Sequence, residues 1–364
     1  MEYTVFSTRG GGLLNLTRRE FVASGLAAAP QNTKILNYNP NMEYRRLGKT
    51  GLMVSAVSLG GHWKRVATMM PPGFKGAGYD KTDDQNVNNS LFLKNRDEVL
   101  THCIESGINY VDACSPQEIL AYAKVVKSKR DKIYFGFSWH TREPRFKEWR
   151  DPKKLMQGFE QGLKEAGLDY IDVWRISLPM EGIADLGELK WVEESTVEAL
   201  DLARQQGKAR FTGVSSHNRI WLKSVIQEYP KQIQVVLFPY TANSKELPDD
   251  SVFEAVKKHD VGVFGIKPFA DNSLFLGDSS LNHPQAADDD NRARMAIRYI
   301  LSNPAISAAI PGLVNTHQVD NVALAVRERR KLDRREKAEL DSAGRRMWAN
   351  LRPGYEWLRN WEYV

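Results

Sequence analysis

The stretch Gly107-Ile-Asn-Tyr-Val-Asp-Ala-Cys114 is a short apolar run that ends in an acid and a thiol. Such a run predicts a buried strand whose C-terminal end carries polar groups. A helical pattern follows over residues 118–127, and a second apolar run, residues 133–137, ends in Ser138-Trp-His140. The whole stretch predicts one strand-helix-strand unit with the polar residues of both strands at the same end. In barrels built from such units, chemistry takes place at that end.

Apolar runs and helical patterns alternate along most of the chain. The expected strands cover residues 56–61, 108–113, 133–139, 170–178, 209–215, 234–240, 261–269 and 307–312. The expected helices cover residues 97–106, 118–127, 152–166, 189–206, 219–228, 251–259, 291–302 and 316–326. About eight β-α units result, the number that closes a (β/α)8 TIM barrel in the α/β class. A doubly wound open sheet is the alternative, but no strand is followed by GxGxxG.

Three segments lie outside this repeat. Residues 44–55 hold two short alternating runs around Gly48-Lys-Thr-Gly51, which predicts an N-terminal hairpin. Residues 62–96 are rich in Gly, Pro, Asn and Asp, and a long loop in this position is expected to cover the barrel mouth. The C-terminal tail, residues 347–364, is rich in Trp and Tyr and is therefore expected to pack across the barrel.

Composition limits the classes of partner. With 364 residues, 42% of them hydrophobic, the chain can bury a substantial core. Its 51 Lys and Arg against 45 Asp and Glu give a net charge of only +6. Part of that excess lies in a mixed-charge pattern over residues 327–346, which indicates a solvated face rather than a nucleic-acid surface. Two cysteines cannot form a disulfide framework, and no run approaches the ~20 apolar residues of a membrane span.

The N-terminus carries a candidate targeting signal. Thr17-Arg-Arg-Glu-Phe-Val22 precedes a small, weakly apolar run over residues 23–30. This pattern resembles a twin-arginine export signal, which would send the protein to the periplasm or outside the cell. The alternative is a frayed helix that happens to contain an Arg pair, in a cytoplasmic protein. We expect a leader over residues 1–41, a barrel over 42–346 and the aromatic tail over 347–364.

Five motifs stand in order along residues 42–326. They are Arg45-Arg-Leu-Gly-Lys-Thr-Gly-Leu52, Gly107-Ile-Asn-Tyr-Val-Asp-Ala113, Gly167-Leu-Asp-Tyr-Ile-Asp-Val173, Gly213-Val-Ser-Ser216 and Ile310-Pro-Gly312. Together they resemble the aldo-keto reductases. The resemblance implies a TIM barrel plugged by a hairpin. It also implies reduction of small-molecule carbonyls by NADPH or NADH, through a tetrad of Asp, Tyr, Lys and His.

The tetrad is matched here in one position of four, by Asp112. The turn after Asp112 is shortened and has no Tyr, the Lys position corresponds to Ser138, and the His position corresponds to Ser177. Protonating a new alkoxide needs an acid that titrates near the working pH, and His62 and His140 are expected at this face. The candidate catalytic residues are therefore Asp112, His140, His62 and Ser177.

Without the family Lys, Asp112 needs another cation, because burying a lone carboxylate costs several kcal/mol. Arg175 and Lys267 both interrupt apolar strands. Arg175 shares a strand face with Ser177, so if Ser177 points inward, Arg175 is expected inside the barrel opposite Asp112.

The resemblance also implies contacts to a nicotinamide cofactor, NADP or NAD. By position, Ser215 and Ser216 match the family pair that binds the carboxamide, and Tyr240 matches the ring that stacks on the nicotinamide. Gly312 and Gln318 fall where the family usually has a basic residue for the 2′-phosphate. The candidate cofactor residues are Ser215, Ser216, Tyr240, Lys267, Pro268, Gly312 and Gln318. No His pair has ligand spacing such as HxxxH, so no metal is expected. The alternative function is a non-catalytic barrel that binds a ligand or partner through its loop face.

Overall fold

The computed structural model describes residues 3–5, 14–16, 34–63, 87–178, 183 and 185–364, in two compact units, residues 1–34 and 35–364. In the first unit, β1 (Tyr3–Val5) and β2 (Leu14–Leu16) form an antiparallel hairpin. The Arg18-Arg19 pair of the expected leader and residues 64–86 of the expected mouth loop lie outside the described residues.

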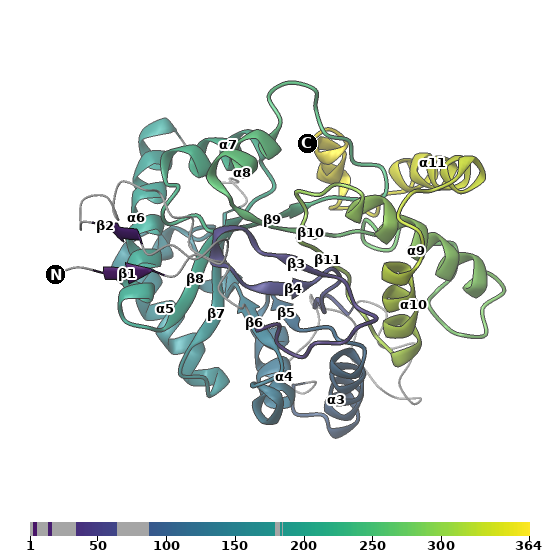
Figure 1. Cartoon of the computed structure of the whole chain (residues 1–364), viewed down its shortest axis with the longest axis horizontal. Coiled ribbons are helices and arrows are strands. Elements are labelled where there is room, and N and C mark those ends of the chain that lie inside the picture. The colour runs from purple at the N-terminus through teal and green to yellow at the C-terminus, as the bar shows by residue number, and fades with distance from the viewer. Residues whose placement is uncertain (1–2, 6–13, 17–33, 64–86, 179–182, 184) are drawn as a thin grey trace. The chain divides into compact units, whose positions relative to one another are not determined.

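The second unit is built around a parallel sheet in the order β11-β10-β9-β8-β7-β6-β5 (Figure 1). Its strands are β5 (Tyr110–Ala113), β6 (Tyr134–Phe137), β7 (Ile171–Ser177), β8 (Ala209–Ser215), β9 (Val235–Pro239), β10 (Gly262–Ile266) and β11 (Ala308–Ile310). The expected first strand, residues 56–61, joins the two edges. Ser58 N donates to Ala309 O at 2.9 Å, and Asp112 N donates to Leu59 O at 2.9 Å. The sheet thus closes into the predicted barrel.

Helices surround this barrel. They are α3 (Ser90–Glu105), α4 (Pro116–Val126), α5 (Pro152–Ala166), α6 (Leu186–Gln205), α7 (Arg219–Glu228), α8 (Val252–His259), α9 (Ala286–Leu301), α10 (Thr316–Arg327) and α11 (Arg334–Ala349). Short 3₁₀ turns are η1 (Gly48–Thr50), η3 (Lys127–Lys129), η4 (His140–Arg142), η5 (Lys147–Trp149) and η6 (Glu356–Trp361). No helix in the described residues is long and apolar enough to cross a membrane.

The helix starts that differ most from the apolar periodicity are those of α3 and α9, which both begin earlier than predicted. α3 begins at Ser90, because the Asn89 side chain caps it by accepting from the backbone N–H of Leu91 and Phe92. α9 begins at Ala286, and its first turn holds Asp288 and Asp289. Carboxylates stabilise a helix N-terminus without contributing to an apolar stripe.

The predicted hairpin fills the N-terminal end of the barrel. β3 (Tyr44–Arg46) pairs with β4 (Met53–Ser55), and both lie over the ring of strands in Figure 1. Leu47 and Val54 are fully buried among strand side chains of the interior. Gly48 has φ +47°, and a Cβ there would lie 2.2 Å from Gly262 N, so only glycine allows this approach.

The aromatic tail packs against the barrel, as expected. Trp361 is buried and its ring stacks on Phe238 of β9, with centroids 5.4 Å apart. Its Nε1 donates to His217 O at 3.0 Å. The tail therefore reaches the loops at the C-terminal ends of the strands.

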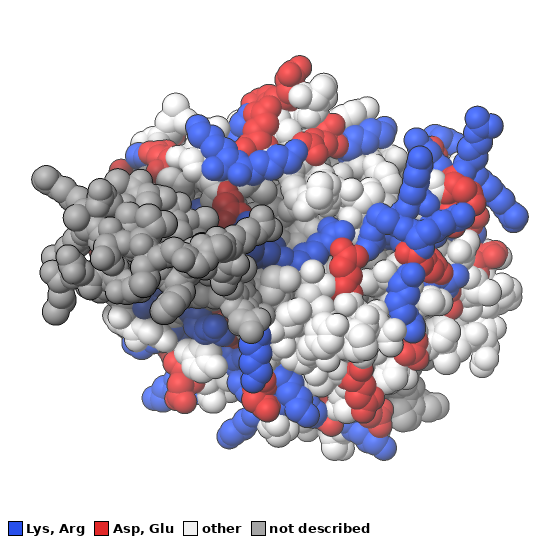
Figure 2. Space-filling view, viewed as in Figure 1, with Lys and Arg blue, Asp and Glu red and all other residues white. Residues whose placement is uncertain are grey.

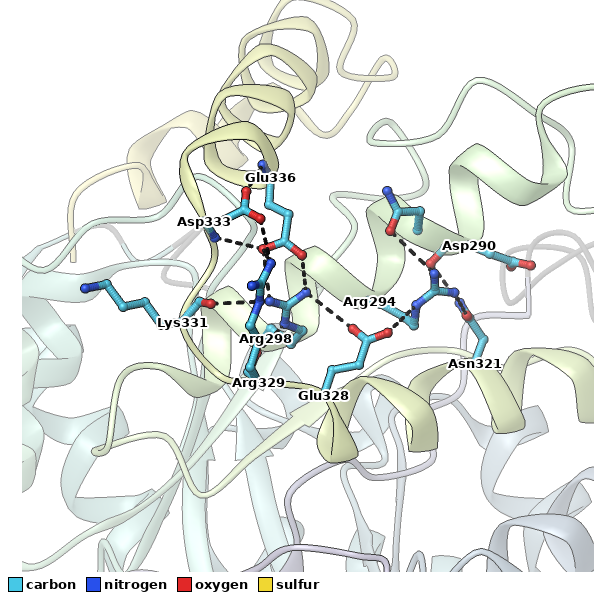
Figure 3. A network of polar contacts seen from close by, with 10 residues as sticks. Asp290, Arg294, Arg298, Asn321, Glu328, Arg329, Lys331, Asp333 and Glu336 are labelled. Atoms are coloured by element: carbon cyan, nitrogen blue, oxygen red, sulfur yellow. Dashed lines mark hydrogen bonds and ion pairs between the residues drawn. The ribbon is translucent and has the colours of Figure 1, made fainter.

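The mixed-charge region before the tail, residues 327–346, is not only the solvated face that its composition indicates, because it also makes contacts with a buried side chain. Arg298 of α9 is buried and donates to Glu336 of α11 through Nη1 and Nη2, at 2.9 and 3.1 Å (Figure 3). It also donates to Arg329 O at 2.6 Å. These contacts attach α11 to α9. Elsewhere on the visible face of this unit, basic and acidic side chains are interspersed (Figure 2).

Candidate active site at the barrel mouth

A cavity of about 730 Å³ opens at the C-terminal ends of the strands. Most of the predicted site residues line it. They are His62, Asp112, His140 and Ser177 from the catalytic set, and Ser215, Ser216, Lys267, Pro268, Gly312 and Gln318 from the cofactor set. The parallel strands and their following loops bring these residues together.

Tyr240 is the exception among the predicted site residues. Its ring packs edge-on against Phe253 of α8, with centroids 5.8 Å apart, on the helix side of the sheet. Side chains alternate along a strand, and Leu237 faces the barrel interior. Tyr240 therefore points outward, and the structure does not bring it to the cavity.

Asp112 and Arg175 form a buried ion pair inside the barrel. Arg175 Nη2 lies 2.5 Å from Asp112 Oδ2, and Nε donates to Oδ1 at 3.1 Å. Nη1 donates to Ser215 Oγ at 3.2 Å. Burial alone would lower the pKa of Arg175, but the carboxylate raises it above its usual value. The predicted pairing is confirmed, and the fork-shaped geometry fixes both side chains.

A second buried carboxylate, Glu118, holds His62 at the cavity. His62 Nδ1 lies 2.8 Å from Glu118 Oε1, and the His62 backbone N–H donates to the same oxygen. Glu118 Oε2 accepts from Cys114 N at 2.7 Å. Although burial opposes it, His62 and these amides lower the pKa of Glu118 to about 2. The Ser115-x-x-Glu118 capping box at the start of α4 is the sequence signal for this carboxylate.

His140 has a different environment. Its Nδ1 lies 2.8 Å from Cys114 O, which leaves Nε2 as the acceptor nitrogen of the neutral ring. Burial lowers the pKa of His140, and burial raises the pKa of the Cys114 thiol. At neutral pH His140 is therefore a neutral imidazole and Cys114 an unreactive thiol.

Glu143 connects the two strand ends that correspond to the family Lys and His. Its Oε2 accepts from Ser138 Oγ at 2.6 Å and from Ser177 N at 2.8 Å. The carboxyl group is almost fully buried, and burial raises its pKa to about 7. No periodic pattern marks Glu143, which follows the short turn η4, so sequence reasoning missed it.

The cavity wall next to the start of α10 is built from backbone and from side chains that cap the helix. Asn315 caps α10 by accepting from Gln318 N, and Gln318 Oε1 accepts from Val314 N at 2.9 Å. A Cβ on Gly312 would lie 2.5 Å from Gly61 O, so two loops approach closely here. Gln318 therefore fixes the loop that enters the helix.

Carboxylates of α9 face the same wall. Asp290 Oδ2 lies 2.6 Å from His317 Nε2, and Asp289 Oδ1 lies 2.7 Å from Arg292 Nη1. The Lys and Arg side chains that line the cavity, Arg145, Arg175 and Lys267, follow or belong to β6, β7 and β10. Within the described residues, no group of three His, Cys, Asp or Glu is arranged to hold a metal ion.

Comparisons with known proteins agree with this architecture. The model of the aldo/keto reductase family matches residues 93–345. L-galactose dehydrogenase of Arabidopsis thaliana is 24% identical over 314 residues, which cover 79% of this chain and 89% of that protein. The uncharacterized oxidoreductase YqkF of Bacillus subtilis (strain 168) is 22% identical over 66% of this chain and 85% of its own length.

A solved structure shares the fold. The holo form of aldo-keto reductase AKR11C1 from Bacillus halodurans superposes with a TM-score of 0.58 at 20% identity. The match covers 86% of this chain and 99% of that one.

Proposed function

Because the chain belongs to the aldo/keto reductase family, we propose that it transfers hydride between a nicotinamide dinucleotide and a small molecule bound in the mouth cavity. A bound nicotinamide would supply or accept the hydride. The chain itself must hold the substrate and supply the proton that a newly formed alkoxide requires. Ser138 and Ser177 stand where the family has Lys and His, so that proton must come from another group.

The observation that carries the proposal is the His62–Glu118 pair. Glu118 is ionised at neutral pH because its pKa is about 2, and its Oε1 lies 2.8 Å from His62 Nδ1. Glu118 fixes the orientation of the His62 ring through Nδ1 at the edge of the cavity. His62 is thus the proposed acid in reduction and base in oxidation.

Asp112 and Arg175 serve a different role in this proposal. Their pairing fixes two opposite charges at the base of the cavity, where they orient polar ligand groups without exchanging protons. His140 is the weaker acid candidate, because burial keeps it neutral.

The residues at α10 fit the phosphate and ribose part of a dinucleotide. The α10 N-terminus offers backbone N–H groups and a positive dipole end, which suit a diphosphate. Asp289 and Asp290 are acceptors that suit ribose hydroxyls and repel a 2′-phosphate. We therefore propose NAD rather than NADP as the preferred form.

The substrate proposed is a polyhydroxylated carbonyl or alcohol. Ser177, Ser215 and Ser216 place hydroxyl groups along the cavity wall, where they can bind ligand hydroxyls. The Arabidopsis relative is named for a sugar, L-galactose, which has this chemistry.

The test is NADH or NADPH oxidation with a reactive aldehyde such as 4-nitrobenzaldehyde. Replacing His62→Gln should lower the rate by roughly 10²–10⁴-fold, the usual contribution of a general acid. His140→Gln and Tyr355→Phe, which also change cavity-lining groups, should have smaller effects.

Binding is measured separately from turnover. Titration with NADH and NADPH, followed by nucleotide fluorescence, should give the tighter binding for NADH. A rate in His62→Gln equal to the wild-type rate would exclude His62 as the proton donor. Nucleotide binding with no turnover of any aldehyde or sugar would instead favour the non-catalytic barrel.

A further inference from the structure

A fully buried guanidinium lies next to the cavity wall at the start of α10. Arg96 of α3 has no exposed surface; its Nη1 donates to Leu313 O at 2.8 Å, and its Nη2 donates to Val314 O at 3.0 Å. Both carbonyl groups belong to residues that line the cavity. The side chain of Asn95 accepts from Arg96 Nε at 3.0 Å and donates to Val314 O at 3.1 Å. α3 is therefore bonded to the loop between β11 and α10 by these neighbouring side chains.

These hydrogen bonds fix two peptide groups of the loop. A peptide group is planar and trans, so its N–H points opposite to its C=O. Since the Leu313 and Val314 carbonyls accept from Arg96, the N–H groups of Val314 and Asn315 point away from it. The Val314 N–H donates to Gln318 Oε1 at 2.9 Å, and Asn315 is the N-cap of α10. Arg96 thus sets the direction in which the chain enters α10.

The same guanidinium also contacts the segment that carries His62. Arg96 Cζ lies 5.0 Å from the centroid of the Trp63 ring. Trp63 Nε1 donates to Tyr122 OH at 3.1 Å, and Tyr122 OH donates to Gly60 O at 2.6 Å. Gly60 and His62 both line the cavity. One buried side chain is therefore in contact with two of the loops that form the mouth.

The charge of Arg96 is not balanced by a carboxylate in the part of the chain that the structure describes. Burial lowers the pKa of Arg96, but a guanidinium stays protonated at pH 7. A neutral side chain of similar size would avoid the cost of burying this charge. The guanidinium instead supplies a rigid set of donors for two carbonyl groups, and it places a positive charge close to the N-terminus of α10.

We propose that Arg96 is a positioning residue for the nucleotide: it holds residues 311–315 so that the N-terminus of α10 is presented to the diphosphate. Arg96 itself does not line the cavity, so it acts through the loop and through its charge. That the ligand is a nucleotide rests on the proposed function, whereas the fixing of the loop does not.

The binding test uses ADP-ribose, which carries the diphosphate and both riboses but no nicotinamide. Isothermal titration calorimetry on the full chain gives its affinity. Arg96→Met removes the charge and the donors, and should weaken the binding by about tenfold or more. Arg96→Lys keeps the charge but loses the fork of donors, and should recover part of that affinity.

A matched control separates positioning from a loss of stability. Leu222→Ala leaves a cavity at a fully buried position of α7, which does not line the mouth cavity. This variant should unfold at lower urea concentration than wild type and bind ADP-ribose with unchanged affinity. In the aldehyde assay, Arg96→Met should raise KM for NADH by a larger factor than it lowers kcat. Circular dichroism checks that each variant is folded under the conditions of the assay.

Hydrogen–deuterium exchange of the ligand-free chain tests the fixing of the loop without any nucleotide. Arg96→Met should speed exchange in residues 313–318 and leave residues 219–228 of α7 at the wild-type rate. If Arg96→Met does not fold, Arg96→Lys takes its place, with the same direction of change and a smaller size.

Two results would overturn the inference. One is wild-type exchange of residues 313–318 in the Arg96 variant. The other is a loss of ADP-ribose affinity no larger than in Leu222→Ala. A wild-type chain that binds no ADP-ribose would instead refute the proposed nucleotide, and the exchange measurement would then decide by itself whether Arg96 fixes the loop.

Discussion

At the hairpin end the barrel interior is filled by aliphatic and aromatic side chains, whereas at the mouth the same barrel buries carboxylates and a guanidinium. The change from apolar to charged side chains occurs within single strands. In β5, Tyr110 stacks on Phe264 in the apolar layer, and Asp112, two residues further along, joins Arg175. Residues two apart point the same way, so one strand contributes to both layers. The hairpin end is stabilised by buried apolar area, whereas the mouth depends on the pairing of buried charges such as Asp112 and Arg175.

The largest effect should come from breaking the Asp112–Arg175 pair. Arg175→Met leaves a buried carboxylate without its cation, which should cost about 3–5 kcal/mol in the free energy of unfolding. Urea denaturation followed by circular dichroism measures this loss. The double variant Asp112→Asn/Arg175→Met removes both charges and should recover most of it. A loss under about 1 kcal/mol in the single variant would mean that the two ends do not differ as described.

At the hairpin end the corresponding change is Leu47→Ala. Leu47 is fully buried, so the cavity left behind should cost roughly 3–5 kcal/mol. The affinity for nucleotide should stay at the wild-type value, because Leu47 does not line the mouth cavity. The control is Leu186→Ala, at a side chain that is 83% exposed, which should change stability by less than about 0.5 kcal/mol. Altered ligand affinity in Leu47→Ala would show that the two ends are coupled.

The comparison between the two ends of the barrel can also be tested through the pH dependence of stability, which Glu143 should change. Its pKa of about 7 lies above the usual 4.5, so the folded protein holds a proton that the unfolded chain releases. That stabilisation is complete below about pH 4.5 and is lost as pH rises through about 7, a change on the order of 3 kcal/mol. Glu143→Gln removes it. The stability of the variant relative to wild type should therefore rise between pH 4.5 and 8 in urea denaturation. A difference that is independent of pH would contradict the raised pKa.

The smallest effect should come from an exposed ion pair at the hairpin end. Arg46 Nη1 lies 2.6 Å from Asp260 Oδ2, but both side chains are about half exposed. Solvent screens such a pair, so Arg46→Gln should cost less than about 1 kcal/mol in the same urea assay. A cost comparable to that of Arg175→Met would show that burial is not what separates the two ion pairs.

The sequence by itself determined the barrel and its plug. Strand and helix periods alternate clearly from Ile108 onward, and the Gly48–Gly51 turn predicts the hairpin. Strand alternation also placed Arg175 opposite Asp112, because both lie inside regular strands whose faces can be counted.

Tertiary structure alone decided how the mouth is assembled. Glu118 meets His62 across 56 positions of sequence, and Glu143 meets Ser177 across 34. Trp361, in the tail that also carries Trp357, binds the His217 carbonyl across 144 positions. Loops that follow strands have no period from which a side-chain direction can be read, so the chain pattern could not predict these contacts. Tyr240 is a different case, because it lies just past the end of β9, where the strand alternation still turns its ring towards α8 and away from the cavity. The contacts among the mouth loops are instead set by the packing of elements that are distant in sequence, which the local sequence does not encode.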